Sequence, residues 1–143
     1  MTGRVFVDSN VWIYFFTGDD NLKGKIAREY ISESVERRCA VISYQVVNEV
    51  CCVLKKQKYA EYEIRRVAED MMGLCEVCVQ SRDVIFLASE LREKYSFSYW
   101  DSQVVASALI SRCDVLASED MQDGLKINDM CLVNVFASDH MHN

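Results

Sequence analysis

The 143-residue sequence contains no proline at all. No proline-rich linker, repeat or low-complexity stretch divides it, and no run of about 18 apolar residues suggests a membrane-spanning helix. The N-terminus also lacks a signal-peptide pattern, because only three apolar residues separate Arg4 from Asp8. We therefore expect a single cytoplasmic domain spanning residues 1–143, with the last few residues frayed.

Histidine is almost as scarce. The two histidines are His140 and His142, near the end of the chain, where a metal site with Asp139 competes with a frayed tail. Without a histidine in the body of the chain, Ser-His-Asp catalysis, Cys-His catalysis and an H-E-x-x-H zinc site are all disfavoured. The glycine motifs G-x-x-x-x-G-K-[ST] and G-x-G-x-x-G, which bind phosphates, are missing too. If the protein is an enzyme, acidic residues must carry its chemistry.

Cysteine, by contrast, occurs seven times, an odd number spread through apolar segments. Free cysteine behaves as a small buried hydrophobe. The C-x-x-C pair of Cys75 and Cys78 has no second pair to complete a zinc site, and residues three apart in a strand point to opposite faces. We interpret these cysteines as packing residues.

Short apolar runs alternate with helical patterns along the chain. Strands are predicted at residues 4–7, 39–42, 75–79, 114–117 and 131–136. Helices are predicted at about 9–16, 21–37, 43–57, 60–73, 81–95 and 100–112. This alternation predicts an α/β fold, a three-layer α/β/α domain around a mostly parallel, five-stranded central sheet.

Acidic residues stand where a site would form in such a sheet. Asp8 ends the first strand and Asp120 follows the strand at 114–117, so both are expected at the carboxyl edge. Glu49 lies at the border of the buried stripe of its helix. Asp101 lies on the apolar side of the start of the last helix. Four carboxylates are thus expected at one end of the sheet.

Each acid also has a purely local interpretation. Asp8 would favour the positive end of the first helix with Ser9 as its cap, and Asp101 would complete a helix cap. Asp120 would be a turn residue, and Glu49 a solvated helix charge. Their joint placement beside buried apolar residues favours a shared site.

Four segments in order, VFVDSNVWIY, SYQVVNEV, FSYWDSQVVASAL and VLASEDMQDG, resemble the acidic motifs of PIN-domain ribonucleases. The likeness covers almost the whole chain and is greatest to the VapC-type toxins of bacterial toxin–antitoxin pairs. It implies hydrolysis of RNA phosphodiester bonds by metal-binding acids, which by position are Asp8, Glu49, Asp101 and Asp120.

The resemblance also implies lesser roles. Asp123 is a candidate to share the role of Asp120, and Asn10 and Ser118 match the small polar residues that support the site. One departure is that the last strand, LVNVFA, lacks the proline that relatives often carry after the asparagine. This departure concerns the end of the strand and leaves the chemistry unchanged.

The residue chemistry points the same way as the resemblance. Several carboxylates share a pocket only if some are protonated or a cation lies among them. Ligands that are all oxygen suit Mg²⁺ or Mn²⁺ rather than zinc. Glu49 either binds the metal or positions the attacking water, and the number of ions, one or two, stays open.

The net charge of −6 bears on the partners. Phosphate contacts normally come from basic residues, which here cluster locally, for example at 55–58 and around Arg92 and Lys94, or simply form a solvated surface. Overall acidity suits a basic antitoxin segment that places an arginine among the carboxylates. A homodimer is also expected, and the aromatic segment at 11–16 is interpreted as core, dimer interface or antitoxin interface.

Two other functions are weighed against the ribonuclease. The segment DSNV faintly resembles aspartate-nucleophile phosphatases, but that class has a second aspartate where this chain has Asn10. The other alternative is a catalytically inactive PIN-like binding module. Such modules usually lose acids, whereas all four are present here.

Overall fold

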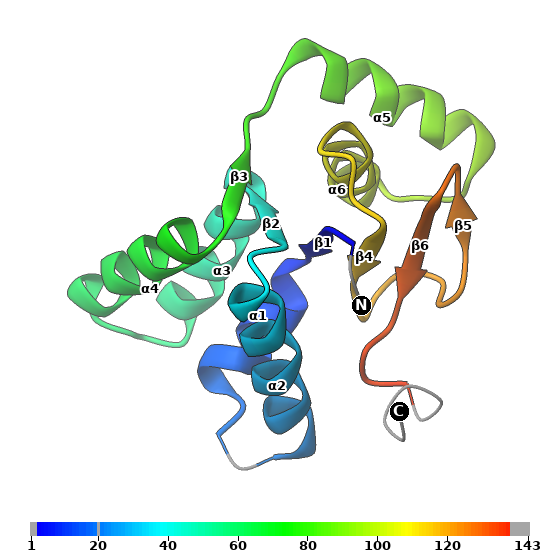
Figure 1. Cartoon of the computed structure of the whole chain (residues 1–143). Helices are drawn as coiled ribbons and strands as arrows, with labels where there is room; N and C mark the ends of the chain where they lie inside the picture. Colours follow the sequence, from blue (N-terminus) through cyan, green and yellow to red (C-terminus); the bar gives the residue numbers. More distant parts are fainter. Residues whose placement is uncertain (1–2, 20, 138–143) are drawn as a thin grey trace.

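The computed structural model describes residues 3–19 and 21–137, and His140, His142 and Asp139 lie outside these residues. Its strands form one sheet in the order β3-β2-β1-β4-β6-β5 (Figure 1). Their bounds are β1 (Val5–Val7), β2 (Ala40–Ser43), β3 (Glu76–Cys78), β4 (Val115–Ala117), β5 (Lys126–Ile127) and β6 (Met130–Val133). All neighbouring strands pair in parallel except β5 and β6, which are antiparallel. The predicted α/β class is confirmed.

The sheet differs from the expected five strands by the addition of β5. Lys126 and Ile127 pair with Cys131 and Met130 across a tight hairpin, in which Asn128 adopts a φ of 54°. Asparagine is one of the few residues other than glycine that readily adopts this conformation. A strand of two residues is too short to show the alternation from which strands are predicted.

In the described part of the chain, six helices flank the sheet, and each corresponds to a predicted one. Their bounds are α1 (Ser9–Thr17), α2 (Leu22–Glu36), α3 (Tyr44–Lys56), α4 (Glu61–Leu74), α5 (Arg82–Lys94) and α6 (Tyr99–Ile110). Ser43 caps α3, as its sequence suggests, by accepting a hydrogen bond from the Val46 N–H. No helix in the described part of the chain is long and apolar enough to cross a membrane.

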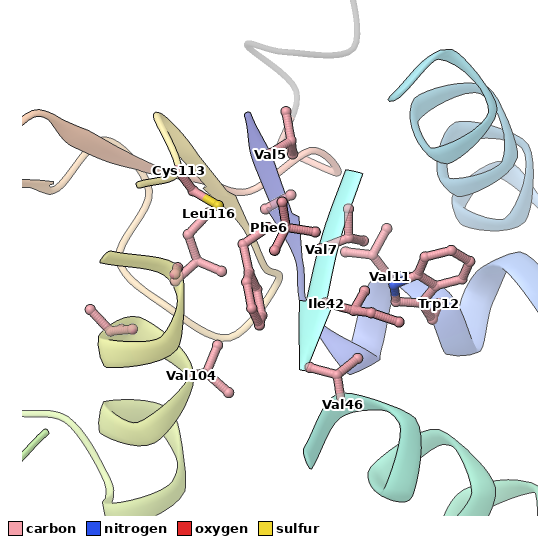
Figure 2. Close-up of a cluster of buried hydrophobic side chains, with 14 of the residues drawn as sticks. Val5, Phe6, Val7, Val11, Trp12, Ile42, Val46, Val104, Cys113 and Leu116 are labelled. Atoms are coloured by element: carbon pink, nitrogen blue, oxygen red, sulfur yellow. The ribbon is translucent and has the colours of Figure 1, made fainter. Parts of the chain in front are cut away.

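The core occupies both faces of the sheet. All three residues of β1 are fully buried, which explains why the strand reads as a continuous apolar run. In Figure 2, Phe6 points toward Val104 of α6, whereas Val7 lies on the other side with Trp12 of α1. The aromatic segment at 11–16 therefore serves the core through Val11 and Trp12, as expected for part of it.

The cysteines do not form a metal site among the described residues. All seven are free thiols, and Cys78 and Cys113 are buried. Cys52 is exposed on α3, so the interpretation of the cysteines as packing residues is wrong for this one. Cys52 follows Cys51 directly, and successive residues of a helix are turned by about 100° around its axis, which here brings Cys52 to the exposed side of α3.

The close approach of α1 and α2 depends on two glycines. A Cβ atom on Gly24 would lie 2.7 Å from the Gly18 carbonyl, whereas a Cβ on Gly73 would meet no atom within 4 Å. We expect Gly24→Ala to lower the free energy of unfolding by about 1–3 kcal/mol, because two backbone segments must move apart. Gly73→Ala, the matched control, should raise it by about 0.5–1 kcal/mol, since alanine restricts the unfolded chain.

Urea unfolding of the three proteins measures these differences through the transition midpoint at constant slope. A Gly24→Ala protein as stable as the wild type would show that the helices do not require this contact.

Candidate functional site

Asp8 anchors the candidate site at the carboxyl end of β1. Its backbone N–H donates to the Ala117 carbonyl at 2.9 Å, which holds the end of β1 against β4. Its side chain caps α1, with Oδ1 accepting from the Ser9 N–H at 2.8 Å, so Asp8 rather than Ser9 is the cap. The Ser118 hydroxyl donates to the other oxygen, Oδ2, at 2.8 Å. Both carboxylate oxygens are thus oriented by residues at the ends of paired strands.

Asn10 and Ser118 join Asp8 to Asp120. The Asn10 amide Nδ2 donates to Asp120 Oδ2 at 3.1 Å and to Ser118 Oγ at 3.2 Å. The side-chain oxygen of Asn10, Oδ1, accepts a hydrogen bond from the Glu119 backbone N–H at 3.0 Å, which fixes the orientation of the side-chain amide. The structure therefore gives Asn10 and Ser118 contacts that position two of the acids, and it brings Asp120 to the carboxyl edge.

Glu49 and Asp101 reach the site from the helices α3 and α6. Ser98 caps α6 by accepting the Asp101 backbone N–H at 3.1 Å. The Asp101 side chain lines, together with Asp120, a cavity of about 330 Å³. Glu49 is half-buried on α3, and the negative charges of Asp8 and Asp101 both act on it. The four predicted acids, which are separated by up to 112 residues, thus converge.

The pKa values of these acids reflect their crowding. Burial raises the pKa of Asp8 to about 6, with smaller contributions from the charges of Asp101 and Asp120, against the lowering effect of its hydrogen bonds. The pKa of Glu49 is raised by burial and then by the charge of Asp8, against the lowering effect of the Ser9 and Gln45 side chains. The pKa of Asp101 is raised by burial and by the charge of Asp120. Clustered, perturbed carboxyl groups of this kind are typical of functional sites.

No basic side chain of the described residues forms an ion pair with any of these four acids. The Oε1 atom of Glu49 is buried and lacks a hydrogen-bond partner within residues 3–19 and 21–137. An orphaned carboxylate oxygen beside other carboxylates fits a hard divalent cation. No three acids are arranged as a ready-made metal site in this described part, so binding an ion requires side-chain adjustment.

Asp123 has a structural contact of its own. Its Oδ1 accepts a hydrogen bond from the Asn134 N–H at 2.9 Å, just beyond the end of β6. This contact holds the segment that follows the last strand. A share in metal binding for Asp123 stays a prediction.

Sequence reasoning missed two features near the acids. Lys23 forms an ion pair with Glu119, and its amine lies 5.2 Å from the centre of the Tyr14 ring. A second cavity, beside Glu49, is lined by residues that include Gln45 and Gln103. Both features join segments that are far apart in the chain, so no local sequence pattern predicts them. Lys94, which was singled out with the basic clusters, lines the cavity of Asp101 and Asp120.

Comparisons with known proteins agree with this fold. The sequence model of the PIN domain family matches residues 5–128. No curated protein sequence matches the chain significantly.

Several solved structures share the fold. A toxin–antitoxin complex from Klebsiella pneumoniae is 20% identical, with a TM-score of 0.71 over 92% of this chain and 98% of that chain. VapC20 of Mycobacterium tuberculosis, a toxin that cleaves the sarcin-ricin loop, is 16% identical, with a TM-score of 0.64 over 78% and 86%. VapBC2 of Rickettsia felis, bound to a promoter DNA fragment, is 15% identical, with a TM-score of 0.68 over 90% and 96%.

Proposed function

Since the chain belongs to the PIN domain family, we propose that it is a metal-dependent endoribonuclease, a single PIN domain that uses Mg²⁺ or Mn²⁺. The observation that carries this proposal is the convergence of Asp8, Glu49, Asp101 and Asp120 without a basic partner among the described residues. Such a group of oxygen ligands is suited to a divalent cation and to phosphodiester hydrolysis.

The contacts of each residue support a separate role. Asp8, Asp101 and Asp120 would hold the metal, and the Ser118 hydroxyl and the Asn10 amide fix the side chains of Asp8 and Asp120 by hydrogen bonds. A bound Mg²⁺ or Mn²⁺ supplies positive charge that acidifies a water molecule and offsets the charge developing on the phosphodiester.

Glu49 suits a different task. Because burial raises the pKa of Glu49, its carboxylate is a stronger base than an ordinary glutamate, and its Oε1 lacks a partner within the described chain. Glu49 therefore either completes the metal site or accepts the proton of the attacking water. Lys94, beside Asp101 and Asp120 in the smaller cavity, is placed to contact an RNA phosphate.

We further propose that this nuclease is the toxin of a bacterial toxin–antitoxin pair and acts in the cytoplasm as a homodimer. Support comes from the fold neighbours, of which one is a toxin–antitoxin complex and another a toxin that cleaves the sarcin-ricin loop. The acidic site suits a basic antitoxin segment, which would neutralise these carboxylates by placing an arginine among them.

Metal dependence gives the direct test. The purified protein should cleave RNA in Mg²⁺ or Mn²⁺, lose at least 99% of its activity in excess chelator, and recover when either ion is restored. Sequencing the 5′ ends of RNA after brief expression would identify the substrate at the same time. Recovery with zinc alone would contradict an all-oxygen site, and RNA binding without cleavage under every condition would indicate an inactive binding module.

A further inference from the structure

A larger cavity, of about 600 Å³, adjoins the acidic site at Glu49. Tyr44 and Gln45 of α3 line one side, Ile85 of α5 another, and Trp100 and Gln103 of α6 a third. This volume lies in the range of pockets that hold small organic ligands. Because Glu49 belongs to both, whatever enters this cavity lies beside the acids.

The walls of the cavity present exposed aromatic rings. Trp100 is 61% exposed, and Tyr44 and Tyr99 are about half-exposed. The guanidinium of Arg92 lies 4.5 Å from the centre of the Tyr99 ring, and Trp100 packs edge-on against Tyr99 at 5.0 Å. The indole is therefore held in a roughly perpendicular contact with Tyr99 while most of its surface faces solvent, which is an arrangement suited to stacking a flat ligand.

Unpartnered polar atoms lie in the same walls. Gln103 is 4% exposed, yet its Nε2 has no hydrogen-bond partner among the described residues. Gln45 donates through Nε2 to the Trp100 carbonyl at 3.3 Å and also interacts with the Glu49 carboxylate, while its Oε1 is buried without a partner within the described chain. Buried amide groups are normally satisfied, so a donor and an acceptor left over in one cavity point to a ligand that supplies both.

The charged residues that line the cavity limit the kinds of ligand that it can bind. Among the described residues that line it, Glu49 is the only carboxylate and none is a lysine or arginine, so a phosphate group does not suit it. The apolar face of a second copy would cover the aromatic rings but would leave the two amide groups unpaired. A neutral, flat ring with hydrogen-bonding groups along its edge would stack on the aromatic rings and pair with the amide groups at the same time. Every nucleotide of RNA carries such a ring, its base.

We propose that this cavity is a nucleobase subsite, in which an unpaired base of the RNA stacks on Trp100 and is read by Gln103 and Gln45. The proposal rests on the ribonuclease function proposed above. The base would belong to a nucleotide close to the cleaved phosphodiester, because Glu49 borders both the cavity and the acidic site.

Tryptophan fluorescence tests the stacking directly. The chain has two tryptophans, of which Trp12 is fully buried and Trp100 is exposed, so a ligand-dependent change reports Trp100. We expect at least one of four single-stranded RNA hexamers, each of a single base, to quench the emission of the Asp101→Asn protein in Mg²⁺. A hexamer of abasic nucleotides should not quench it, and Trp100→Phe in the same protein should remove the effect.

Kinetics of RNA cleavage supply the second measurement. Trp100→Ala should raise KM about tenfold or more with a smaller change in kcat, and Gln103→Leu should weaken the preference among bases. Tyr62→Ala, which removes an equally exposed aromatic ring on α4, is the matched control and should behave as the wild type.

The outcomes separate the two proposals. If the wild type cleaves no RNA with any divalent ion, the ribonuclease function fails. If it cleaves RNA while Trp100→Ala and Gln103→Leu keep the wild-type KM and base preference, the nucleobase subsite is wrong. Trp100 emission that depends on protein concentration but not on RNA would likewise overturn the subsite and assign this face to a second copy of the chain.

Discussion

Replacing Asp8 or Asp101 by asparagine is expected to lower the rate of RNA cleavage by about 100- to 1,000-fold, equivalent to roughly 3–4 kcal/mol in the activation free energy. Each substitution keeps the shape of the side chain but removes a negative charge that the proposed function assigns to metal binding. In a bacterial host, expression of the wild type alone should arrest growth, and both variants should relieve the arrest.

Asp70→Asn is the matched control, since it makes the same chemical change on the exposed surface of α4. Its cleavage rate and growth arrest should equal those of the wild type. Circular dichroism must show that all three variants are folded. If folded Asp8→Asn and Asp101→Asn arrest growth as strongly as the wild type, catalysis at the acidic site is not the cause of toxicity.

The placement of Asp8 and Asp120 illustrates how far sequence reasoning reaches. Buried strands are recognised in the sequence as short apolar runs. Because parallel strands all end at the same edge of a sheet, the residues that directly follow them lie at that edge. The structure has both acids at that edge, linked through Ser118 and Asn10. Their proposed role as metal ligands stays a prediction.

The packing of the helices against one another cannot be predicted from the sequence pattern. Periodicity predicts which face of α3 or α6 is buried, but the distance between Glu49 and Asp101 depends on how the two helices pack. The cavity between them, with Gln103 and Trp100, arises from this packing and from the position of α5. Such a cavity has no signature in a single sequence, because its residues satisfy local helical patterns equally well without it.

The burial of Asp8 lowers the stability of the fold at a place where the proposed function requires a negative charge. Asp8 is only 4% exposed, and it lies among other acids without a basic partner in the described chain. An ordinary fold avoids burying a charge in this way, because the buried ionised form is destabilised relative to water. Such a cost is expected where a site requires charge that a bound cation later compensates.

Asp8→Asn should therefore be more stable than the wild type when metal is removed. The pKa of Asp8 is about 6 in the folded protein against an ordinary value of 3.8. At about 1.4 kcal/mol per pKa unit, ionising Asp8 costs the folded state up to about 3 kcal/mol. Asparagine removes this cost and still caps α1, because it is as good a cap as aspartate. We expect a net gain of about 1–2 kcal/mol in chelator at pH 7.5, or roughly 3–10 °C in Tm.

The stability difference between Asp8→Asn and the wild type should change with pH in a defined direction. Because the folded pKa of Asp8 is raised, the proton stabilises the fold at low pH, and this stability is lost as pH rises from about 4 through about 6. The advantage of Asp8→Asn should thus be largest at pH 7.5 and should vanish or reverse at pH 4.5, where ionising Asp8 costs about 2 kcal/mol less. Mg²⁺ at pH 7.5 should raise the Tm of the wild type much more than that of the variant, because binding favours the native state.

Thermal melts of the wild type, Asp8→Asn and Asp70→Asn, with chelator or Mg²⁺ at both pH values, measure all of these differences. Asp70→Asn should follow the wild type throughout, since its position is exposed. An Asp8→Asn protein that is less stable than the wild type in chelator at pH 7.5 would mean that Asp8 stabilises the fold as a charged helix cap. Combined with equal Mg²⁺ shifts for both proteins, that result would remove Asp8 from the metal site.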